Sequence, residues 1–372
     1  MIYLDYTAHM PASKPALDAF LETENHCLGN ANARHDAGTA ANQRMKDAQH
    51  QIAGLLQVKP EEVIFTSGAS ESNNTAIQGI VYANRHFGRH IVTSPLEHPS
   101  VSGCLTALQE RGYEIDVLPL NSNGQISLEA LQQALRPDTV LVTLCAVDSE
   151  LGSVQQVEKA AQIIKSFPHC RLHMDVTQAI GKINVPFSCV DTASLSAHKF
   201  GGITGSGLLY KKKDTEMEPL IHGGVSTSLY RSGSPAVSLA ASLAAALQET
   251  LTEFEDRLRK VQALNQYLRD ELTKRNVRIH SPKDAIPHIL NVGIDGIKGY
   301  EIRDWLNAHG VCVSVKSACS VENTPSRAVY AVTGNRRQAL ESWRISLSHL
   351  TAMEELNDFL GILDLILEDK RK

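Results

Sequence analysis

Segments with helical patterning alternate with short apolar segments from about residue 38 to residue 210, and few folds accommodate this alternation. The apolar segments, such as His90–Thr93 and Thr139–Cys145, have the length and composition of buried strands. Strands that alternate with helices form a largely parallel sheet that helices cover on both faces. The sequence therefore predicts an α/β fold, in which ligands bind where loops leave the carboxyl ends of the strands.

The predicted elements of this unit follow one another closely. The predicted helices are 38–56, 70–86, 99–112, 127–135 and 155–166, and the predicted strands are 63–65, 90–93, 113–117, 139–145, 171–174, 192–196 and 206–210. A long helical segment from Ser234 to Lys274 follows and is typical of a connector. The remainder mixes short strands with helices near 299–308 and 352–368, which indicates a smaller α+β domain.

Composition excludes several classes of protein. The 372 residues, 42% of them apolar and 21% charged, are typical of a soluble globular chain, and the net charge of −5 gives no reason to expect nucleic acid as a partner. No apolar run approaches the roughly 18 residues of a membrane span. Met1–Asp5 is strand-like and unlike a leader, so we expect a cytoplasmic protein with no membrane partner. Seven scattered cysteines without a C-x-x-C pair indicate reduced thiols and no metal site.

Asp175 and Lys199, 24 residues apart, carry the strongest chemical signal. Asp175 ends an apolar run and precedes Gln178, and Lys199 follows the strand-like Ser194–His198 and precedes two glycines. Pyridoxal phosphate requires a carboxylate that keeps its pyridine nitrogen protonated and a lysine that forms a Schiff base. Taken singly, such an aspartate is more often a turn residue and such a lysine is more often solvated, as we expect for Lys211–Lys213. Together they favour a pyridoxal-phosphate site.

Four further features suit the same chemistry. The turn Thr66–Ser70 joins a strand to a helix, where backbone N–H groups cradle phosphate, and His98 follows a strand and could stack on a flat ring. Cys319 lies in a predicted loop, where an exposed thiol can act as a thiolate, and Arg344 suits capture of a carboxylate. A helix cap, an incidental histidine, a surface cysteine and a surface arginine are the structural alternatives, so these assignments depend on Asp175 and Lys199.

In this order the residues resemble the cysteine desulfurases of the iron–sulfur assembly and nitrogen-fixation type, which belong to the class V group of fold-type I pyridoxal-phosphate enzymes. The resemblance is carried by Tyr3–Ala8, Gly29–Asn30 with His35, Thr66–Asn73, Glu97–Pro99, Asp175–Lys182, Ser194–Lys199, Ile221–Gly224, Arg231–Ser234, Ser317–Ser320 and Arg344–Leu347. It implies a mostly parallel seven-stranded sheet in a large domain over 13–255. It also implies a small α+β domain from 1–12 and 256–372 that carries the catalytic cysteine loop at about 316–325.

The resemblance also implies a role for each candidate residue. Lys199 forms the Schiff base and removes the Cα proton of L-cysteine, and Cys319 takes the sulfur as a persulfide while L-alanine is released. Asp175 pairs with the pyridine nitrogen, Gln178 bonds the phenol oxygen and His98 stacks on the ring. The phosphate is held by Ala69, Ser70, Ser196, His198 and, from the second subunit of a homodimer, Ser234. The substrate is bound by Arg344 and Asn30.

One departure from the family lies beside the expected cofactor. Asp148-Ser149 stands where the family usually has two asparagines, and Ser149 takes the place of the asparagine that bonds the phenol oxygen. The resemblance implies transfer of sulfur to an acceptor protein, for iron–sulfur clusters or tRNA thiolation. Two alternatives stay open: a class V relative with another substrate, such as a selenocysteine lyase or an aminotransferase, which Ser149 favours, and a non-catalytic partner protein that kept the fold.

Overall fold

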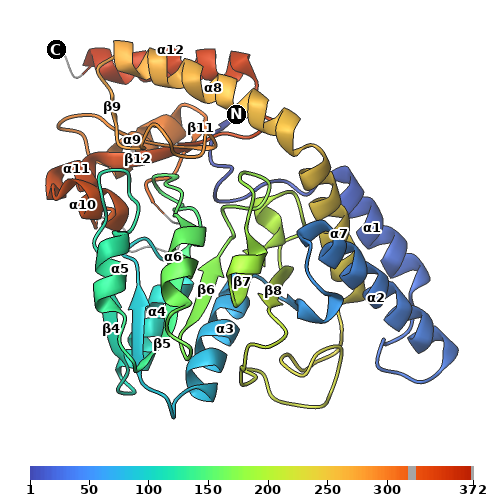
Figure 1. Cartoon of the computed structure of the whole chain (residues 1–372). Helices are drawn as coiled ribbons and strands as arrows, with labels where there is room; N and C mark the ends of the chain where they lie inside the picture. Colours follow the sequence, from blue (N-terminus) through green and yellow to red (C-terminus); the bar gives the residue numbers. More distant parts are fainter. Residues whose placement is uncertain (317–323, 370–372) are drawn as a thin grey trace.

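A seven-stranded sheet organises the computed structural model, which describes residues 1–316 and 324–369 (Figure 1). Its strands, in spatial order, are β2 (Val63–Thr66), β8 (Gly207–Lys211), β7 (Thr192–Ser196), β6 (Arg171–Asp175), β5 (Thr139–Cys145), β3 (His90–Thr93) and β4 (Glu114–Val117). Only β8 runs antiparallel to its neighbours, β2 and β7. The predicted α/β fold with a largely parallel sheet is confirmed.

Helices bury both faces of this sheet. Successive strand residues face opposite sides, so Ile91 packs with α3 (Ala69–Ala83) and α4 (Pro99–Gln109), whereas Val92 joins a second cluster. That second cluster includes residues of α5 (Leu128–Ala134), α6 (Val157–Ile164) and α7 (Val237–Thr252). Burial on both faces explains why the strands are continuous apolar runs that the sequence reveals clearly.

Two further helices lie outside the sheet. Helices α1 (Lys14–His26) and α2 (Asp36–Leu56) both pack against α7, on the right of Figure 1. The pattern of residues 38–56 predicts α2, but α1 is not predicted. Its first turn is nevertheless marked by a Ser13 cap and a proline, two ordinary signals of a helix start.

A second, smaller unit lies above the carboxyl ends of the large sheet (Figure 1). Its three-stranded antiparallel sheet has β10 (Ile289–Gly293) between β9 (Arg278–Ile279) and β12 (Ser342–Ser346), and β1 (Ile2–Tyr3) pairs with β11 (Val311–Cys312). The helices of this unit are α9 (Gly299–Ala308), α10 (Arg327–Thr333), α11 (Arg336–Glu341) and α12 (Met353–Asp369). Leu4 and residues from Val261 to Ile366 share a separate hydrophobic core. On this basis we propose domains of 13–255, and of 1–12 with 256–372.

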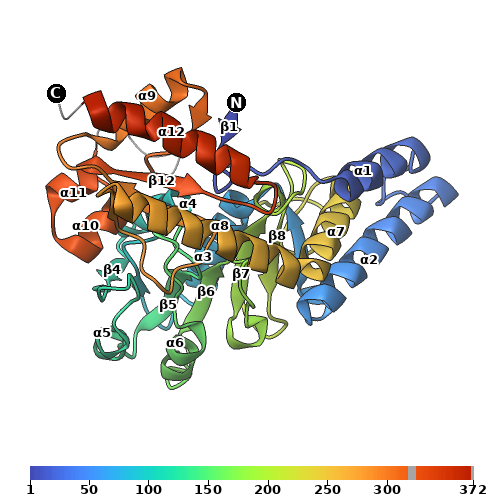
Figure 2. The ribbon, with the colours of Figure 1, turned by 90° about the horizontal axis from the view of Figure 1, so that it is seen from above.

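The helical segment predicted from Ser234 to Lys274 is present, but the structure divides it into two helices. Helix α7 ends at Thr252 and α8 (Phe254–Lys274) begins after Glu253, whose φ and ψ of −96° and 9° interrupt the helix. Leu247 of α7 packs in the core of the large sheet and Val261 of α8 in the second core. The break at Glu253 therefore lets α7 pack in one core and α8 pack in the other. Figure 2 shows α8 next to α12, which it contacts.

A close backbone approach places the start of α3 beside β8. Gly68 precedes α3 with a φ of 150°, a conformation that side chains rarely allow, and Gly207 lies against it. A Cβ on Gly207 would lie 2.4 Å from the Gly68 Cα and 2.7 Å from the Leu195 carbonyl oxygen.

Among the described residues, no helix has both the length and the apolar character needed to cross a membrane.

Gly207→Ala should therefore destabilise the fold and displace the start of α3. We expect the free energy of unfolding to fall by about 1 to 3 kcal/mol, as for other overpacked sites, when it is measured by urea denaturation. Gly54→Ala is the matched control, because nothing lies within 4 Å of a Cβ at this exposed position in the last turn of α2. That variant should gain about 0.5 to 1 kcal/mol. A Gly207→Ala protein as stable as the wild type would contradict this account.

Candidate active site

A cavity of about 310 Å³ opens at the carboxyl ends of the large sheet. The expected site residues that line it are Ala69, Ser70, His98, Ser149, Asp175, Gln178, Ser196, His198, Lys199 and Arg344. They come from the ends of separate strands of the large sheet, from the loop after β5, and from β12 of the second sheet. The structure thus brings most of the predicted site residues around one space, between the two hydrophobic cores.

Among the described residues, two predicted site residues, Asn30 and Ser234, do not line this cavity. Asn30 is exposed, and its Oδ1 accepts a hydrogen bond from the Asn32 N–H at 2.9 Å. Ser234 is also exposed. Cys319 lies outside the described residues. The roles of these three residues stay predictions.

Asp175, at the end of β6, is buried and accepts two hydrogen bonds. Its Oδ2 accepts from Nδ2 of Asn73 at 2.9 Å, and its Oδ1 accepts from the Thr177 N–H at 2.9 Å. Asn73 Oδ1 in turn lies 2.9 Å from Nε2 of His173. Because an amide oxygen only accepts, His173 Nε2 carries the proton and Nδ1 accepts from the Thr192 hydroxyl at 2.8 Å. Burial lowers the pKa of His173 to about 4, so the ring is neutral near pH 7.

The same network orients His98. Nδ1 of His98 accepts from the Ser100 N–H at 3.1 Å and lies 2.8 Å from the Ser100 hydroxyl, at the start of α4. That hydroxyl accepts from Nδ2 of Asn73 at 2.9 Å and therefore donates to His98. Burial lowers the pKa of His98, with smaller contributions from the charges of Lys199 and Arg327. His98 thus presents a neutral ring whose proton is on Nε2.

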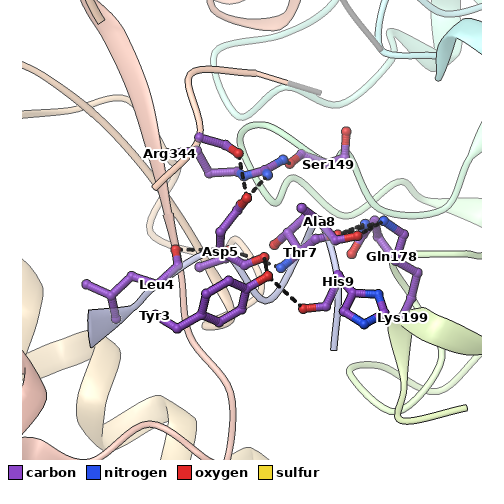
Figure 3. A network of polar contacts seen from close by, with 12 residues as sticks. Tyr3, Leu4, Asp5, Thr7, Ala8, His9, Ser149, Gln178, Lys199 and Arg344 are labelled. Carbon is purple, nitrogen blue, oxygen red and sulfur yellow. Dashed lines mark hydrogen bonds and ion pairs between the residues drawn. The ribbon is translucent and has the colours of Figure 1, made fainter. Parts of the chain in front are cut away.

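Two backbone carbonyls hold the Lys199 amine (Figure 3). Nζ donates to the Thr7 carbonyl at 2.9 Å and to the Ala8 carbonyl at 2.7 Å. The Thr7 carbonyl also accepts from Nε2 of Gln178 at 3.2 Å, and Lys182 donates to Oε1 of Gln178 at 2.8 Å. Burial, together with the charges of Lys199 and Arg344, lowers the pKa of Lys182 to about 7. The amide of Gln178 is therefore fixed with its N–H groups toward Thr7 and its oxygen toward Lys182.

The start of α3 forms another wall of the cavity. Ser196 Oγ accepts from the Ala69 N–H at 2.7 Å, which links the end of β7 to the helix N-terminus. A helix N-terminus with nearby hydroxyls suits a phosphate group. The cavity therefore combines this anion site with a buried carboxylate, a neutral histidine, an amide and a primary amine. These residues fit pyridoxal phosphate.

The family departure at Asp148 has a structural explanation. Asp148 is buried, and its Oδ2 accepts from the N–H groups of Glu150, at 3.1 Å, and Leu151, which stabilises the turn after β5. Burial, with the neighbouring Glu150 carboxylate, raises the pKa of Asp148 to about 7. Ser149 lines the cavity, and its carbonyl accepts from Nη1 of Arg344 at 2.8 Å.

Glu97 is a third buried acid, adjacent to His98 in the sequence. Its Oε1 accepts from the Ser94 hydroxyl at 2.7 Å and from the Cys145 N–H at 2.8 Å, whereas Oε2 has no partner among the described residues. Burial raises the pKa of Glu97 to about 8. The protonated form is thus the stable one at neutral pH, so Glu97 adds no negative charge next to His98.

Sequence reasoning gave no role to several residues that organise this site. Asn73 lies inside the motif Thr66–Asn73, and His173 lies in the predicted strand 171–174. Asn73 falls four residues after Ala69, on the same side of α3. That spacing is a signal that could have identified Asn73. Thr7 and Ala8 act through their carbonyls, for which the side chains give no signal.

Replacing Glu97 should change how stability depends on pH. Between pH 5 and pH 8 the unfolded chain has lost the Glu97 proton while the folded protein keeps it, so the contribution of Glu97 to stability falls as pH rises, by up to about 1.4 kcal/mol per pH unit. Glu97→Gln removes this loss, so its stability relative to wild type should increase from pH 5 to pH 8 in urea denaturation. The exposed Glu129→Gln is the control and should parallel the wild type. Identical pH dependence of Glu97→Gln and wild type would refute the assignment of a raised pKa.

The sheet order and the lysine–aspartate pair at the cavity define the architecture of the fold-type I pyridoxal-phosphate enzymes. The family model for aminotransferase class-V matches residues 2–359. The chain is 33% identical to the cysteine desulfurase IscS of Dictyoglomus turgidum over 376 residues, which cover 100% of this chain and 95% of that protein. The chain belongs to the aminotransferase class-V family.

Solved structures agree with this assignment. A NifS-like protein superposes with a TM-score of 0.93 at 30% identity, covering 99% of each chain. SspA in complex with cysteine superposes with a TM-score of 0.84 at 28% identity, covering 95% of this chain and 100% of that one. The similarity thus extends over both hydrophobic cores, and the family implies a pyridoxal-phosphate cofactor.

Proposed function

We propose that the protein is a pyridoxal-phosphate-dependent cysteine desulfurase, which converts L-cysteine to L-alanine and forms a persulfide on Cys319. The observation that carries this proposal is the arrangement of Lys199, Asp175 and Arg344 around one cavity. Similarity to cysteine desulfurases over the full chain, and to a protein solved with cysteine, supports the substrate.

The cavity residues would hold the cofactor as the resemblance implies. Lys199 would attach it, Asp175 would keep its ring nitrogen protonated, Gln178 and Ser149 would contact its phenol oxygen, and His98 would pack on the ring. The phosphate would be held by Ala69, Ser70, Ser196 and His198, and by the partner subunit's Ser234. Pyridoxal phosphate supplies an electron sink for the bonds at the substrate's Cα.

The chain's own residues perform the remaining steps. Arg344 binds the substrate carboxylate, with Asn30 as a further substrate contact, and Nζ of Lys199 removes the proton from Cα. The Cys319 thiolate then attacks the substrate sulfur. A sulfur–sulfur bond forms, the Cβ–S bond breaks with its electron pair left on Cβ, and a proton completes the methyl group of alanine.

We also propose a cytoplasmic homodimer that passes sulfur to an acceptor protein, for iron–sulfur clusters or tRNA thiolation. Asn32 donates to Ser226 at 3.0 Å and Ser226 donates to the Gly233 carbonyl at 2.8 Å, so the segments that contain Asn30 and Ser234 lie together. Exposed apolar side chains lie in or beside these segments: Leu28, Val225 and Leu229. An apolar patch of this kind is typical of an interface, which supports the contribution of both residues to the partner's site.

A class V relative with another substrate is the second candidate, which Ser149 at the cavity favours. Release of alanine from L-cysteine and from L-selenocysteine by the same preparation separates the two. A selenocysteine lyase would act on selenocysteine alone.

Cys319→Ser should keep the visible absorbance of bound cofactor and lose sulfide release from L-cysteine, because only the sulfur acceptor is removed. Sulfide and alanine are measured with a reductant present. Cys189→Ser is the control, since Cys189 is a partly exposed free cysteine that does not line the cavity. Wild-type sulfide release by Cys319→Ser would rule out the proposed role of that thiol.

A further inference from the structure

The guanidinium of Arg344 is committed to two partners in this structure (Figure 3). Arg344 is only 2% exposed, yet it lines the cavity. Nη2 donates to Oδ1 of Asp5 at 2.8 Å and Nη1 donates to the Ser149 carbonyl at 2.8 Å. Nε has no partner among the described residues. A guanidinium carries five N–H groups, so these contacts leave others for a substrate.

Asp5 is itself fixed in place. Its Oδ2 accepts from the Ser314 hydroxyl at 2.7 Å, and its carbonyl accepts from the Tyr3 hydroxyl at 3.1 Å. The Asp5 backbone forms a bridge to Ser346 of β12, two residues from Arg344. The carboxylate is therefore anchored to the same strand whose arginine it contacts.

Ser314 closes a ring of contacts. The Ser314 N–H donates to the Arg344 carbonyl at 3.3 Å and its carbonyl accepts from the Arg344 N–H at 2.6 Å. Ser314 therefore holds the Arg344 backbone, Ser314 also holds Asp5, and Asp5 holds the Arg344 guanidinium. Such a closed arrangement restricts the rotamers of a long side chain before any ligand arrives.

We propose that Asp5 is a positioning residue for recognition of the substrate's α-carboxylate, which it performs by fixing the plane of the Arg344 guanidinium. This inference rests on the proposed function of the same cavity. A planar guanidinium binds a carboxylate through two parallel N–H groups only when its plane is correctly oriented. Asp5 occupies one edge and leaves the remaining N–H groups for the ligand.

Neutralising Asp5 should change substrate affinity in opposite directions under the two possible roles of this residue. If Asp5 only competed with the substrate for Arg344, its neutralisation would strengthen substrate binding. If Asp5 positions Arg344, the loss of a charge-assisted hydrogen bond weakens binding. Asp5→Asn should therefore raise the KM for L-cysteine about tenfold and change kcat less than about threefold.

A ligand without a carboxylate separates positioning from general damage. Cysteamine has the amine and thiol of cysteine but no carboxylate, so its Kd for holoenzyme should be the same in Asp5→Asn and wild type. The Kd of L-alanine, which keeps the carboxylate and undergoes no desulfuration, should rise about tenfold in Asp5→Asn. Both are measured by calorimetry on holoenzyme of wild type, Asp5→Asn and the surface control Asp18→Asn, whose carboxylate is paired with Lys14 on α1.

Ser314→Ala provides a second, independent variant. It removes the anchor of Asp5 and leaves both charges, so alanine binding should weaken about threefold, and Asp5→Asn/Ser314→Ala should bind alanine like Asp5→Asn alone. An unchanged or lower KM and alanine Kd in Asp5→Asn, or equal weakening of cysteamine and alanine, would overturn the inference. A wild type that binds alanine but releases no sulfide from cysteine would instead refute the proposed function, while the alanine and cysteamine measurements still decide the role of Asp5.

Discussion

The hydrogen bond from Asn73 to Asp175 is the interaction on which the rest of the site depends. A carboxylate buried at the end of β6 is costly unless donors compensate it, and Asn73 supplies one from α3, which begins at the anion-binding wall. The same amide nitrogen bonds Ser100, which orients His98. One asparagine therefore connects Asp175, His98 and the start of α3 to one another.

Burial more than nearby charge defines the donors and acceptors of this network. It lowers the pKa of His98, His173 and His198, so each ring has one N–H donor and one acceptor nitrogen. It also raises the pKa of Glu97. The direction of each hydrogen bond then follows from a fixed partner at one end, which is the amide oxygen of Asn73 for His173 and the Ser100 N–H for His98. A site with defined tautomers is prepared before its ligands bind.

The sequence predicts the sheet well, because central strands such as β5 are buried on both faces and are rich in apolar residues. It also identifies most cavity residues, since most of them lie at a strand end or shortly after one, whereas Arg344 lies within β12. It misses the division between α7 and α8, where no glycine or proline marks the turn at Glu253. Lys211, expected to be solvated, is 4% exposed, because its amine donates to the carbonyls of Lys212 and Lys213 and lies 4.6 Å from the centre of the Tyr230 ring. Carbonyl contacts of this kind depend on the fold and leave no pattern in the sequence.

The pairing of residues 2–5 with β11 and β12 has a consequence for how the chain matures. The strand that carries Arg344 leaves the ribosome more than three hundred residues after Asp5, although the two side chains touch. The large sheet can assemble during synthesis, whereas the pocket is completed only at its end. Until then the first residues remain unpaired, and a nascent chain that has already formed its main sheet cannot yet bind an amino acid there.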